Sequence, residues 1–452
     1  KKKKKTRLST LKSPQCGLPL QHSGKHCSTE PGETPDPVRT LVRLCVDRHY
    51  ISVGEGNAEL FRRGVSCSYG PLGLELRRNL LEQWWHSVTR SSAHVFGINT
   101  VNISGDTAAG GPEQLRIVES ESFQRIFEKQ KVSKEQLVQM LQELLLRSPP
   151  VRKNLFKGAL EQFVPSLELV NGKLPFGLAE TGLCFQPSGG SGCSANEVMQ
   201  TSLVWFCSPR TSSQWLDHWS RQRLKWWRKF ALSPSDFSSG DVPEEELEEV
   251  VSRGVRIMYN FPWGQEPLET LWIRGDTELL QKSHAVLTVL QCREDRKSVP
   301  HVVSVTGNLD RGMMAFLSNS LQQLKKVNGR QRLQQRNVLK LHPTLAPVKV
   351  ALDISRGATV ELRQVCEGLQ QELMEAEVSV WPGYLKTLPT SVEHLNAKYD
   401  EMGVLFTMMI SENTLESGLL KVRSRDTTIK ETMHISEIKN FLCRYISAAD
   451  NI

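Results

Sequence analysis

The strongest constraint on the fold is an alternation of strand-like and helix-like segments in the C-terminal part of the chain. Apolar residues form short runs at 348–354 and 404–410, and between these runs they recur at helical spacing. The order predicts a mixed sheet flanked by helices, because parallel neighbours need helical crossovers whereas a hairpin is antiparallel. The expected segments are strand 348–354, helix 360–376, strand 378–381, helix 392–402, strand 404–410, the paired strands 419–425 and 427–435, and helix 436–446.

The length of the chain indicates further domains before this one. At 452 residues it exceeds what one hydrophobic core usually supports, which predicts about two or three domains. Apolar residues make up 39% of the chain, and no apolar run reaches the ~18 residues of a membrane-spanning helix. The expected parts are a disordered basic segment 1–37, a core domain 38–132 and 165–329, a helical-hairpin insertion 133–164, a basic linker 330–342 and a C-terminal domain 343–452.

The charge of the chain is unevenly distributed. Lys and Arg number 57 against 49 Asp and Glu, a formal net charge of +8. Residues 1–29 and 311–352 each carry eight basic residues and no acid, whereas residues 241–250 carry six acids. Such local basic fields favour a polyanionic partner, although each run taken alone is equally compatible with a solvated surface.

The cysteine pattern and the first segment indicate the compartment. The ten cysteines include no CxxC pair and no metal-ligand spacing, which predicts free thiols in a reducing compartment, no metal site and no cofactor. The first 29 residues are acid-free and rich in Lys, Ser, Pro and Gly. This composition is typical of the region beside a mitochondrial targeting segment, and equally of an ordinary disordered basic tail.

Residues 133–164 have the pattern of a separate helical hairpin. Ser133 followed by Gln136 is a capping-box signal for a first helix, and Pro149-Pro150 separates it from a second. A lone hairpin cannot bury two wide apolar stripes, so it packs on the parent domain or on a second copy of itself. The residues we expect at this contact are Leu137, Leu141, Leu144, Leu145, Phe156 and Leu160.

Two basic segments are candidates for binding nucleic acid. Between 209 and 230, Arg221, Arg223 and Lys225 are interleaved with tryptophans. This pattern is compatible with a surface that binds nucleic acid. We favour the alternative, a helix whose tryptophans point inward and whose cations point outward. Residues 313–326 are expected to form a helix after a strand at 301–305. That helix and the linker after it carry the second group, which is Lys325, Lys326, Arg330, Arg332 and Arg336.

Several segments, in the right order, resemble class II aminoacyl-tRNA synthetases of the glycyl type over about residues 40–450. The first is 64–85, with Tyr-Gly-Pro-Leu-Gly at 69–73, followed by 174–185 and by 303–317 with its Asp310-Arg311-Gly312. Segments 343–350, 398–404 and 422–427 are similar to the anticodon-binding domain. The resemblance implies an antiparallel-sheet α/β (α+β) domain with the hairpin inserted, a mixed α/β C-terminal domain and a dimer interface that includes Pro71.

The second of these motifs departs from the synthetase pattern. The family continues with Phe-Arg-Asn-Glu, whereas this chain has Phe185, Gln186, Pro187 and Ser188. A fixed arginine normally offsets the charge that grows on the α-phosphate during amino-acid activation, and a preorganised charge of this kind is usually the largest catalytic contribution. Arg311 keeps the third-motif arginine, but Gln186 and Ser188 predict a degenerate ATP site and no enzyme activity.

A chain that resembles a synthetase but lacks the catalytic arginine is similar to one further family. This family is the accessory subunits of the animal mitochondrial replicative DNA polymerase. This resemblance implies a homodimer formed through the hairpin, binding of double-stranded DNA and of the catalytic polymerase subunit, greater processivity, and a place in the mitochondrial matrix at the nucleoid. A divergent active glycyl-type synthetase and a tRNA-binding regulator remain the alternative hypotheses.

Overall fold

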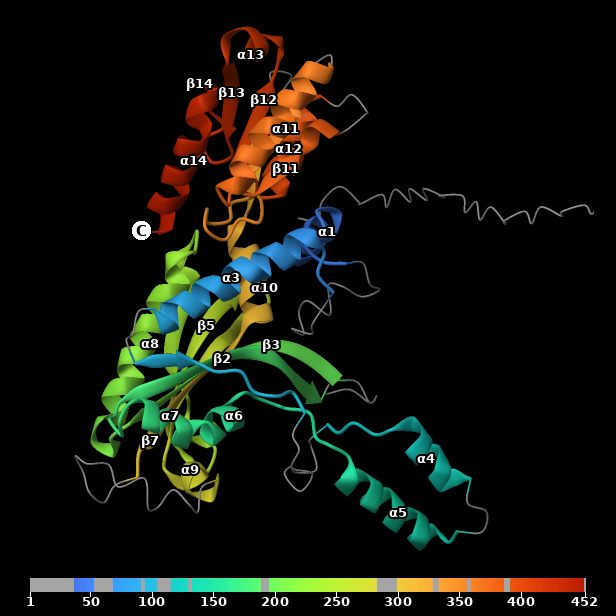
Figure 1. The fold of residues 1–452 in the computed structure, drawn as a ribbon, viewed down its shortest axis with the longest axis vertical. Coiled ribbons are helices and arrows are strands. Elements are labelled where there is room, and N and C mark those ends of the chain that lie inside the picture. Colours follow the sequence, from blue (N-terminus) through green and yellow to red (C-terminus); the bar gives the residue numbers. More distant parts are fainter. Residues whose placement is uncertain are drawn as a thin grey trace, which may run out of the picture. The chain divides into compact units, whose positions relative to one another are not determined.

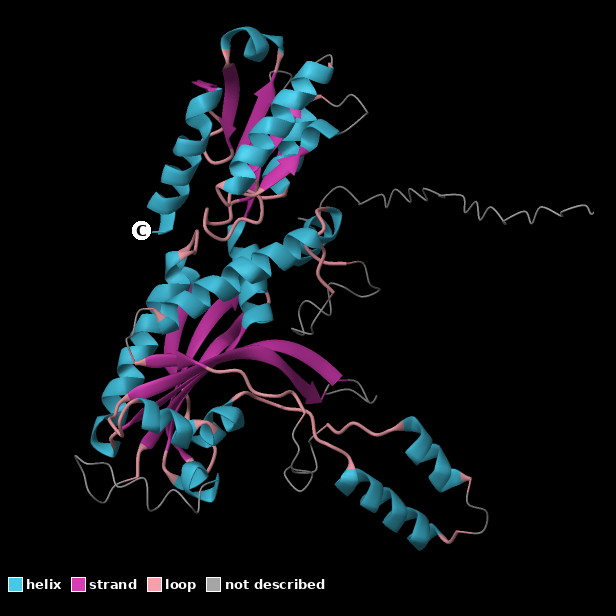
Figure 2. Cartoon of the chain, in the orientation of Figure 1, coloured by secondary structure: helices cyan, strands magenta, loops and turns pink. Residues whose placement is uncertain are grey.

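The computed structural model describes residues 36–52, 68–90, 94–103, 115–128, 132–187, 195–282, 299–327, 333–355, 359–385 and 391–450. The predicted disordered segment therefore lies outside the described residues up to position 35. Figure 1 shows the chain coloured along its sequence, and Figure 2 shows a mixed α/β protein with two main sheets. No helix among the described residues is long and apolar enough to cross a membrane.

The core domain is built on a seven-stranded sheet with the order β1-β2-β3-β7-β6-β5-β4. All neighbouring strands are antiparallel except β1 and β2, so the expected antiparallel-sheet domain is confirmed. The strands are β1 (Val95–Gly97), β2 (Phe176–Pro187), β3 (Ala195–Cys207), β4 (Phe237–Asp241), β5 (Val251–Phe261), β6 (Gly264–Arg274) and β7 (His301–Asn308).

One face of this sheet packs against three helices, α3 (Pro71–Thr89), α8 (Ser212–Lys229) and α10 (Leu309–Ser320). Helix α1 (Pro37–Asp47) adds its apolar side to the same core. Proline suits the first turn of α3 because the amide hydrogen that it lacks has no partner there. In α8 the side chains of Trp219, Trp226 and Trp227 are buried, which confirms the expectation that the tryptophans point inward.

The opposite face carries a second, smaller core. Helices α6 (Phe156–Glu161) and α7 (Phe163–Leu169) pack there with α9 (Thr277–Lys282). Phe156 and Leu160 retain only 6% and 3% of their exposure because they pack against Phe176, Val204 and other sheet residues. The prediction that they form the second helix of the hairpin and its dimer contact is therefore wrong, since their apolar stripe belongs to this core.

The helical pair of the insertion consists instead of α4 (Ser120–Phe127) and α5 (Lys134–Arg147), which we call the arm (Figure 1). Helix α5 begins with the predicted capping box, in which the Ser133 hydroxyl accepts from the Gln136 amide and the Gln136 side chain accepts from the Ser133 amide. Helix α4 was not predicted. No residue of α5 is buried, and Ile126 is the buried residue of α4.

A two-stranded ribbon follows α10 where a longer helix was predicted. Helix α10 ends at Ser320, and β8 (Leu321–Val327) then pairs antiparallel with β9 (Leu333–Leu339). The helical expectation to residue 326 is wrong because pairing with a strand further along the chain overrides the local preference of the sequence. Lys325 and Lys326 thus lie on a strand, whereas Arg330 and Arg332 lie outside the described residues.

The C-terminal domain has the predicted mixed sheet, with the order β11-β10-β12-β13-β14. Strand β10 is parallel to β11 and β12, and β12, β13 and β14 are antiparallel. The short helix α13 was missed. The elements are β10 (Val350–Ile354), α11 (Val360–Glu375), β11 (Val380–Pro382), α12 (Val392–Glu401), β12 (Phe406–Ile410), α13 (Glu412–Ser417), β13 (Leu419–Ser424), β14 (Lys430–His434) and α14 (Ile435–Asp450).

Buried side chains bind backbone carbonyls at the junction between the two sheets. The guanidinium of Arg425 donates to the carbonyls of Leu339, Leu341 and Gly403 at 2.8–3.2 Å. The hydroxyl of Tyr50 donates to the carbonyl of Met402 at 3.0 Å, and burial raises the pKa of Tyr50. The Arg425 bonds fix the chain before β10 against the C-terminal domain, and the Tyr50 bond joins the segment after α1 to the end of α12.

Two glycines provide a matched test of this packing. A Cβ atom on Gly73 in α3 would overlap the carbonyl of Tyr50, whereas a Cβ atom on Gly368 in α11 would meet nothing within 4 Å. We expect Gly73→Ala to lower the free energy of unfolding by about 2–4 kcal/mol, as overpacked backbone contacts do. Gly368→Ala should raise it by about 0.5–1 kcal/mol through helix propensity. Urea unfolding of both variants measures the difference, and a tolerated Gly73→Ala would contradict the close approach.

Candidate functional site

The strand that would carry the catalytic arginine of a synthetase is β2. Gln186 lies near its end and pairs with Asn196 of β3. The side chains of Glu180 and Gln186 point to one face of the strand, which Gly182 leaves open, because successive residues alternate. Ser188 and the glycine-rich segment after it lie outside the described residues. The described part of this motif thus offers an uncharged amide where activation chemistry needs a cation.

Arg311 of the third motif is held by the protein itself. Its guanidinium forms an ion pair with Glu266 of β6 and lies 4.7 Å from the ring centre of Phe261. Trp263 donates to the same carboxylate at 2.6 Å. Burial lowers the pKa of Arg311 to about 10, so the group stays charged at neutral pH. The tip of the β5–β6 hairpin thus supplies a carboxylate to the arginine that could otherwise meet a phosphate.

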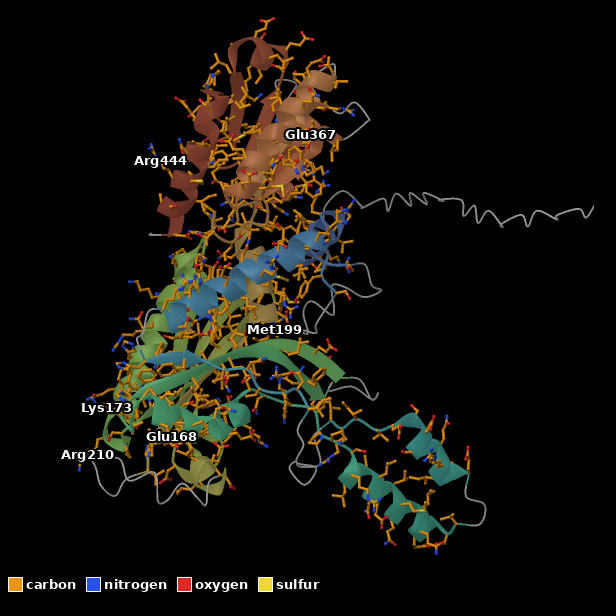
Figure 3. All side chains as sticks on the ribbon, in the orientation of Figure 1. Glu168, Lys173, Met199, Arg210, Glu367 and Arg444 are labelled. Atoms are coloured by element: carbon orange, nitrogen blue, oxygen red, sulfur yellow. The ribbon has the colours of Figure 1, made fainter. Side chains whose placement is uncertain are left out.

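Two of the three motif segments and strand β3 meet at the carboxylate of Asp310. Tyr69, which precedes α3, donates its hydroxyl at 2.8 Å, and the backbone amide of Met199 on β3 donates at 2.7 Å. Arg77 of α3 adds its Nε atom at 3.2 Å. Figure 3 marks Met199 among the side chains of the core. The carboxylate of Asp310 therefore holds these segments of the core domain together.

The first basic group of predicted DNA-binding residues divides into exposed and buried members. Arg221 and Lys225 are exposed on α8. Arg223 is only 2% exposed, pairs with Glu269 at 2.8 Å and lies over the Trp226 ring at 4.4 Å. The prediction that Arg223 binds DNA is wrong, because the buried Glu269 already holds its charge.

The second basic group is also divided. Arg336 on β9 forms an ion pair with Asp400 of α12, which also takes a bidentate pair from Arg423 at 2.9 and 3.1 Å. The prediction that Arg336 binds phosphate is therefore wrong. Lys325 and Lys326 keep their place on β8 as candidates. Neither internal pairing could be predicted from the sequence, because the two acids lie far from their arginines along the chain.

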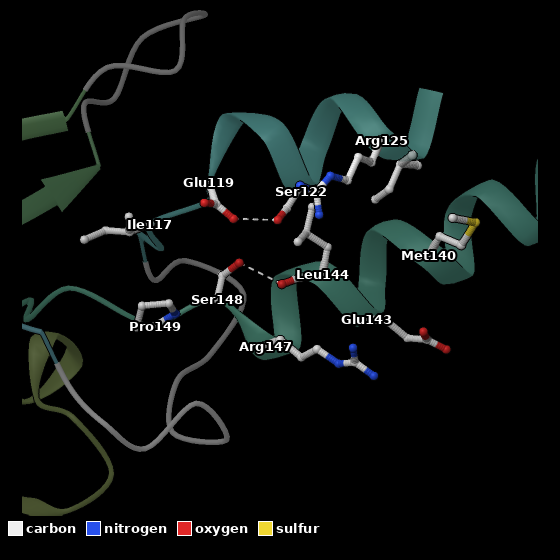
Figure 4. A pocket seen from close by; sticks show the side chains of 11 residues that line it. Ile117, Glu119, Ser122, Arg125, Met140, Glu143, Leu144, Arg147, Ser148 and Pro149 are labelled. Carbon is white, nitrogen blue, oxygen red and sulfur yellow. Dashed lines mark hydrogen bonds between the residues drawn. The ribbon is translucent and has the colours of Figure 1, made fainter. Parts of the chain in front are cut away.

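The arm carries an exposed apolar surface. Phe123, Phe127, Leu145 and Leu146 are between 45% and 62% exposed. A groove of about 480 Å³ between α4 and α5 is lined by Val118, Ser120, Phe123, Gln124, Leu141, Leu144 and Leu145. Figure 4 shows a neighbouring groove, where Met140 and Leu144 of α5 face residues around α4. The predicted contact residues Leu137, Leu141, Leu144 and Leu145 all lie on α5, and Pro71 is exposed at the start of α3.

Comparison with known proteins gives the family. The chain is 46% identical to DNA polymerase subunit gamma-2 of Bos taurus, over 96% of this chain and 91% of that protein. The chain belongs to the DNA polymerase subunit gamma-2 family. Another gamma-2 relative, the mitochondrial DNA polymerase subunit gamma-2 of Xenopus laevis, is 46% identical over 93% of this chain and 90% of its own length.

The gamma-2 family chain also shares the expected distant ancestry. A glycine–tRNA ligase of Corynebacterium glutamicum is 25% identical over 90% of this chain and 98% of that protein. Residues 346–444 match the anticodon binding domain family. The resemblance to glycyl-type synthetases and to mitochondrial polymerase subunits is therefore confirmed, as is the mixed α/β fold class.

The internal pairing of Arg311 makes a sharp prediction about activity. We expect no amino-acid-dependent ATP–pyrophosphate exchange from the wild-type chain. Restoring the motif cation with Gln186→Arg should not create it, because the hairpin tip still occupies Arg311. The glycine–tRNA ligase relative serves as the positive control. Clear exchange by the wild-type chain with any amino acid would contradict the degenerate site.

Proposed function

We propose that this chain is the non-catalytic accessory subunit of the mitochondrial DNA polymerase, which binds duplex DNA and the catalytic subunit and raises processivity. The observation that carries the proposal is full-length similarity to gamma-2 subunits combined with Gln186 at the position of the catalytic arginine. The mitochondrial name of the Xenopus relative supports a mitochondrial location, with the matrix nucleoid as the specific site. The framework is retained as a scaffold, and what it offers is surface for binding.

Duplex DNA is the nucleic acid that we assign to the exposed cations. Arg221 and Lys225 lie one helical turn apart on α8 and together form one positive stripe. Strand β8 adds Lys325 and Lys326 in a stretch of sequence without acids. Contacts of this kind are made to phosphates, are independent of sequence and weaken with salt.

Primer extension tests the accessory role directly. The catalytic polymerase subunit should extend a primed template into longer products when this chain is present than when it is absent. Products of unchanged length, with both proteins shown to be folded, would remove the proposal. If tRNA displaces primer-template duplex at equal concentration, the tRNA-binding regulator becomes the better hypothesis, which the anticodon-like domain supports.

A charge-matched pair of variants tests the DNA contacts. Arg221→Ala with Lys225→Ala should weaken duplex binding and reduce the slope of log affinity against log salt by about one for each lost phosphate contact. Lys157→Ala with Lys173→Ala removes the same charge from exposed positions on α6 and before β2 and should leave that slope unchanged. Filter binding or fluorescence anisotropy across a salt series measures both. Equal slopes for the two double variants would refute the assignment of α8.

The arm is the surface that we assign to a second copy of this chain. It exposes aromatic and leucine side chains, and α5 buries none of its residues within the described protomer. Two such faces related by a two-fold axis would bury each other, because an isologous contact is self-complementary. Leu137, Leu141, Leu144 and Leu145 form its centre on α5, and the exposed Pro71 of α3 belongs to the same proposed interface.

Charged residues on the arm should separate the protomers. We expect Leu141→Glu with Leu145→Glu to raise the dimer dissociation constant at least about a hundredfold, since two apolar side chains on each protomer lose their burial. Gln139→Glu and Gln142→Glu, at other positions of α5, provide the charge-matched control. Sedimentation velocity over a dilution series measures association. A leucine variant that dimerises as tightly as the control would rule out the arm as the contact.

A further inference from the structure

Arg152 occupies the sheet face that also carries position 186, where the synthetase motif has its arginine. The residue follows the arm, and its guanidinium lies over Gly182, on the strand face that also carries Gln186. A Cβ atom at position 182 would overlap the Nη2 atom of Arg152, so only glycine leaves room for it. An arginine is therefore present on this face, but it comes from the insertion and not from the motif.

The side chain of Arg152 is fixed on that face by three acceptors. Its Nε atom donates to the carbonyl of Leu183 at 2.7 Å, and its Nη1 atom donates to the carbonyl of Thr100 at 2.9 Å and to Glu180 at 3.1 Å. Glu180 is almost fully buried and also accepts from the amide and hydroxyl of Thr100 at 2.7 and 2.8 Å. Buried, charge-assisted bonds of this geometry resist separation because each group would lose its partner without gaining water.

The backbone on either side of Arg152 joins the arm to the core. We call segments 100–103, 115–118 and 148–152 the stem. Within it, Val151 donates to Leu115 at 3.0 Å and Ile117 donates to Pro149 at 3.0 Å. Arg152 donates its own amide to Asn102 at 2.9 Å, and its carbonyl accepts from Phe185 on β2 at 3.0 Å. Arg152 is thus the residue where the returning chain meets the sheet with both backbone and side chain.

Among the described residues, the arm is otherwise held by Arg116, which donates to the carbonyls of Leu145 and Ser148 at 3.2 and 2.8 Å. Helix α5 buries no residue, and α4 buries only Ile126 among its described residues. The position of a helical pair without a core of its own depends on the segment that attaches it. We propose that Arg152 is a positioning residue that fixes the arm on the core and thereby sets the geometry of the contact between protomers. This inference rests on the proposed dimer for its second part, but not for its first.

Hydrogen exchange in the full-length protein tests the anchoring. The variant Arg152→Met with Glu180→Gln removes both charges together and leaves no buried carboxylate unpaired. We expect the amides of Ile117, Val151 and Phe185 to exchange about tenfold faster, as local opening replaces a fixed stem. The amides of α11 in the C-terminal domain should keep their wild-type rates. Gly182→Ala should give the same pattern without changing any charge, because its methyl group displaces the guanidinium.

The control and the second readout separate the parts of the proposal. Lys157→Ala removes an exposed cation nearby and should change neither exchange nor association. Sedimentation should show about a tenfold weaker dimer for the double variant and for Gly182→Ala. Unchanged stem amides in both variants would overturn the anchor, and so would faster exchange throughout α11, because Arg152 would then support the whole fold. Faster stem exchange with unchanged association would overturn its role in the dimer. A monomeric wild-type chain would remove the proposed dimer and leave the exchange result to decide the anchor alone.

Discussion

The core depends on the interactions that the carboxylate of Asp310 makes with three other groups. Its bonds to Tyr69, Arg77 and the amide of Met199 join the segment before α3, the helix α3 itself and strand β3. These parts are far apart in the sequence, so their meeting fixes how α3 and α10 lie against the sheet. Because the group is buried, a lost bond would leave a polar atom without water or partner.

Internal carboxylates pair with three arginines of the core domain. Glu266 holds Arg311, Glu180 holds Arg152 and Glu269 holds Arg223. Each arginine stacks on an aromatic ring or spans several acceptors, a geometry for which the planar guanidinium is suited. These paired arginines of the interior serve the fold. The cations that we propose for nucleic acid are on α8 and β8.

The sequence predicted those parts of the fold that local patterns determine. The helix at α3, the capping box of Ser133 and the mixed sheet of the C-terminal domain follow from periodicity and turn residues. The ribbon β8–β9 was missed because β8 pairs with residues 333–339, and nothing in residues 321–327 alone favours a strand. Phe156 and Leu160 show a related limit. Their apolar stripe was recognised, but a stripe does not say which surface will cover it.

The hydrogen bonds of Arg425 have a consequence for which residues at the junction can be substituted during evolution. Arg425 binds the carbonyls of residues 339, 341 and 403, and every amino acid presents the same carbonyl group. Arg425 therefore makes no contact that depends on the linker side chains. Substitutions at those positions leave its hydrogen bonds intact as long as the backbone keeps its path. Selection should instead act on Arg425 itself, since lysine has no planar fork to reach three carbonyls at once. The junction between the two sheets therefore accepts different linker side chains but requires the same backbone geometry.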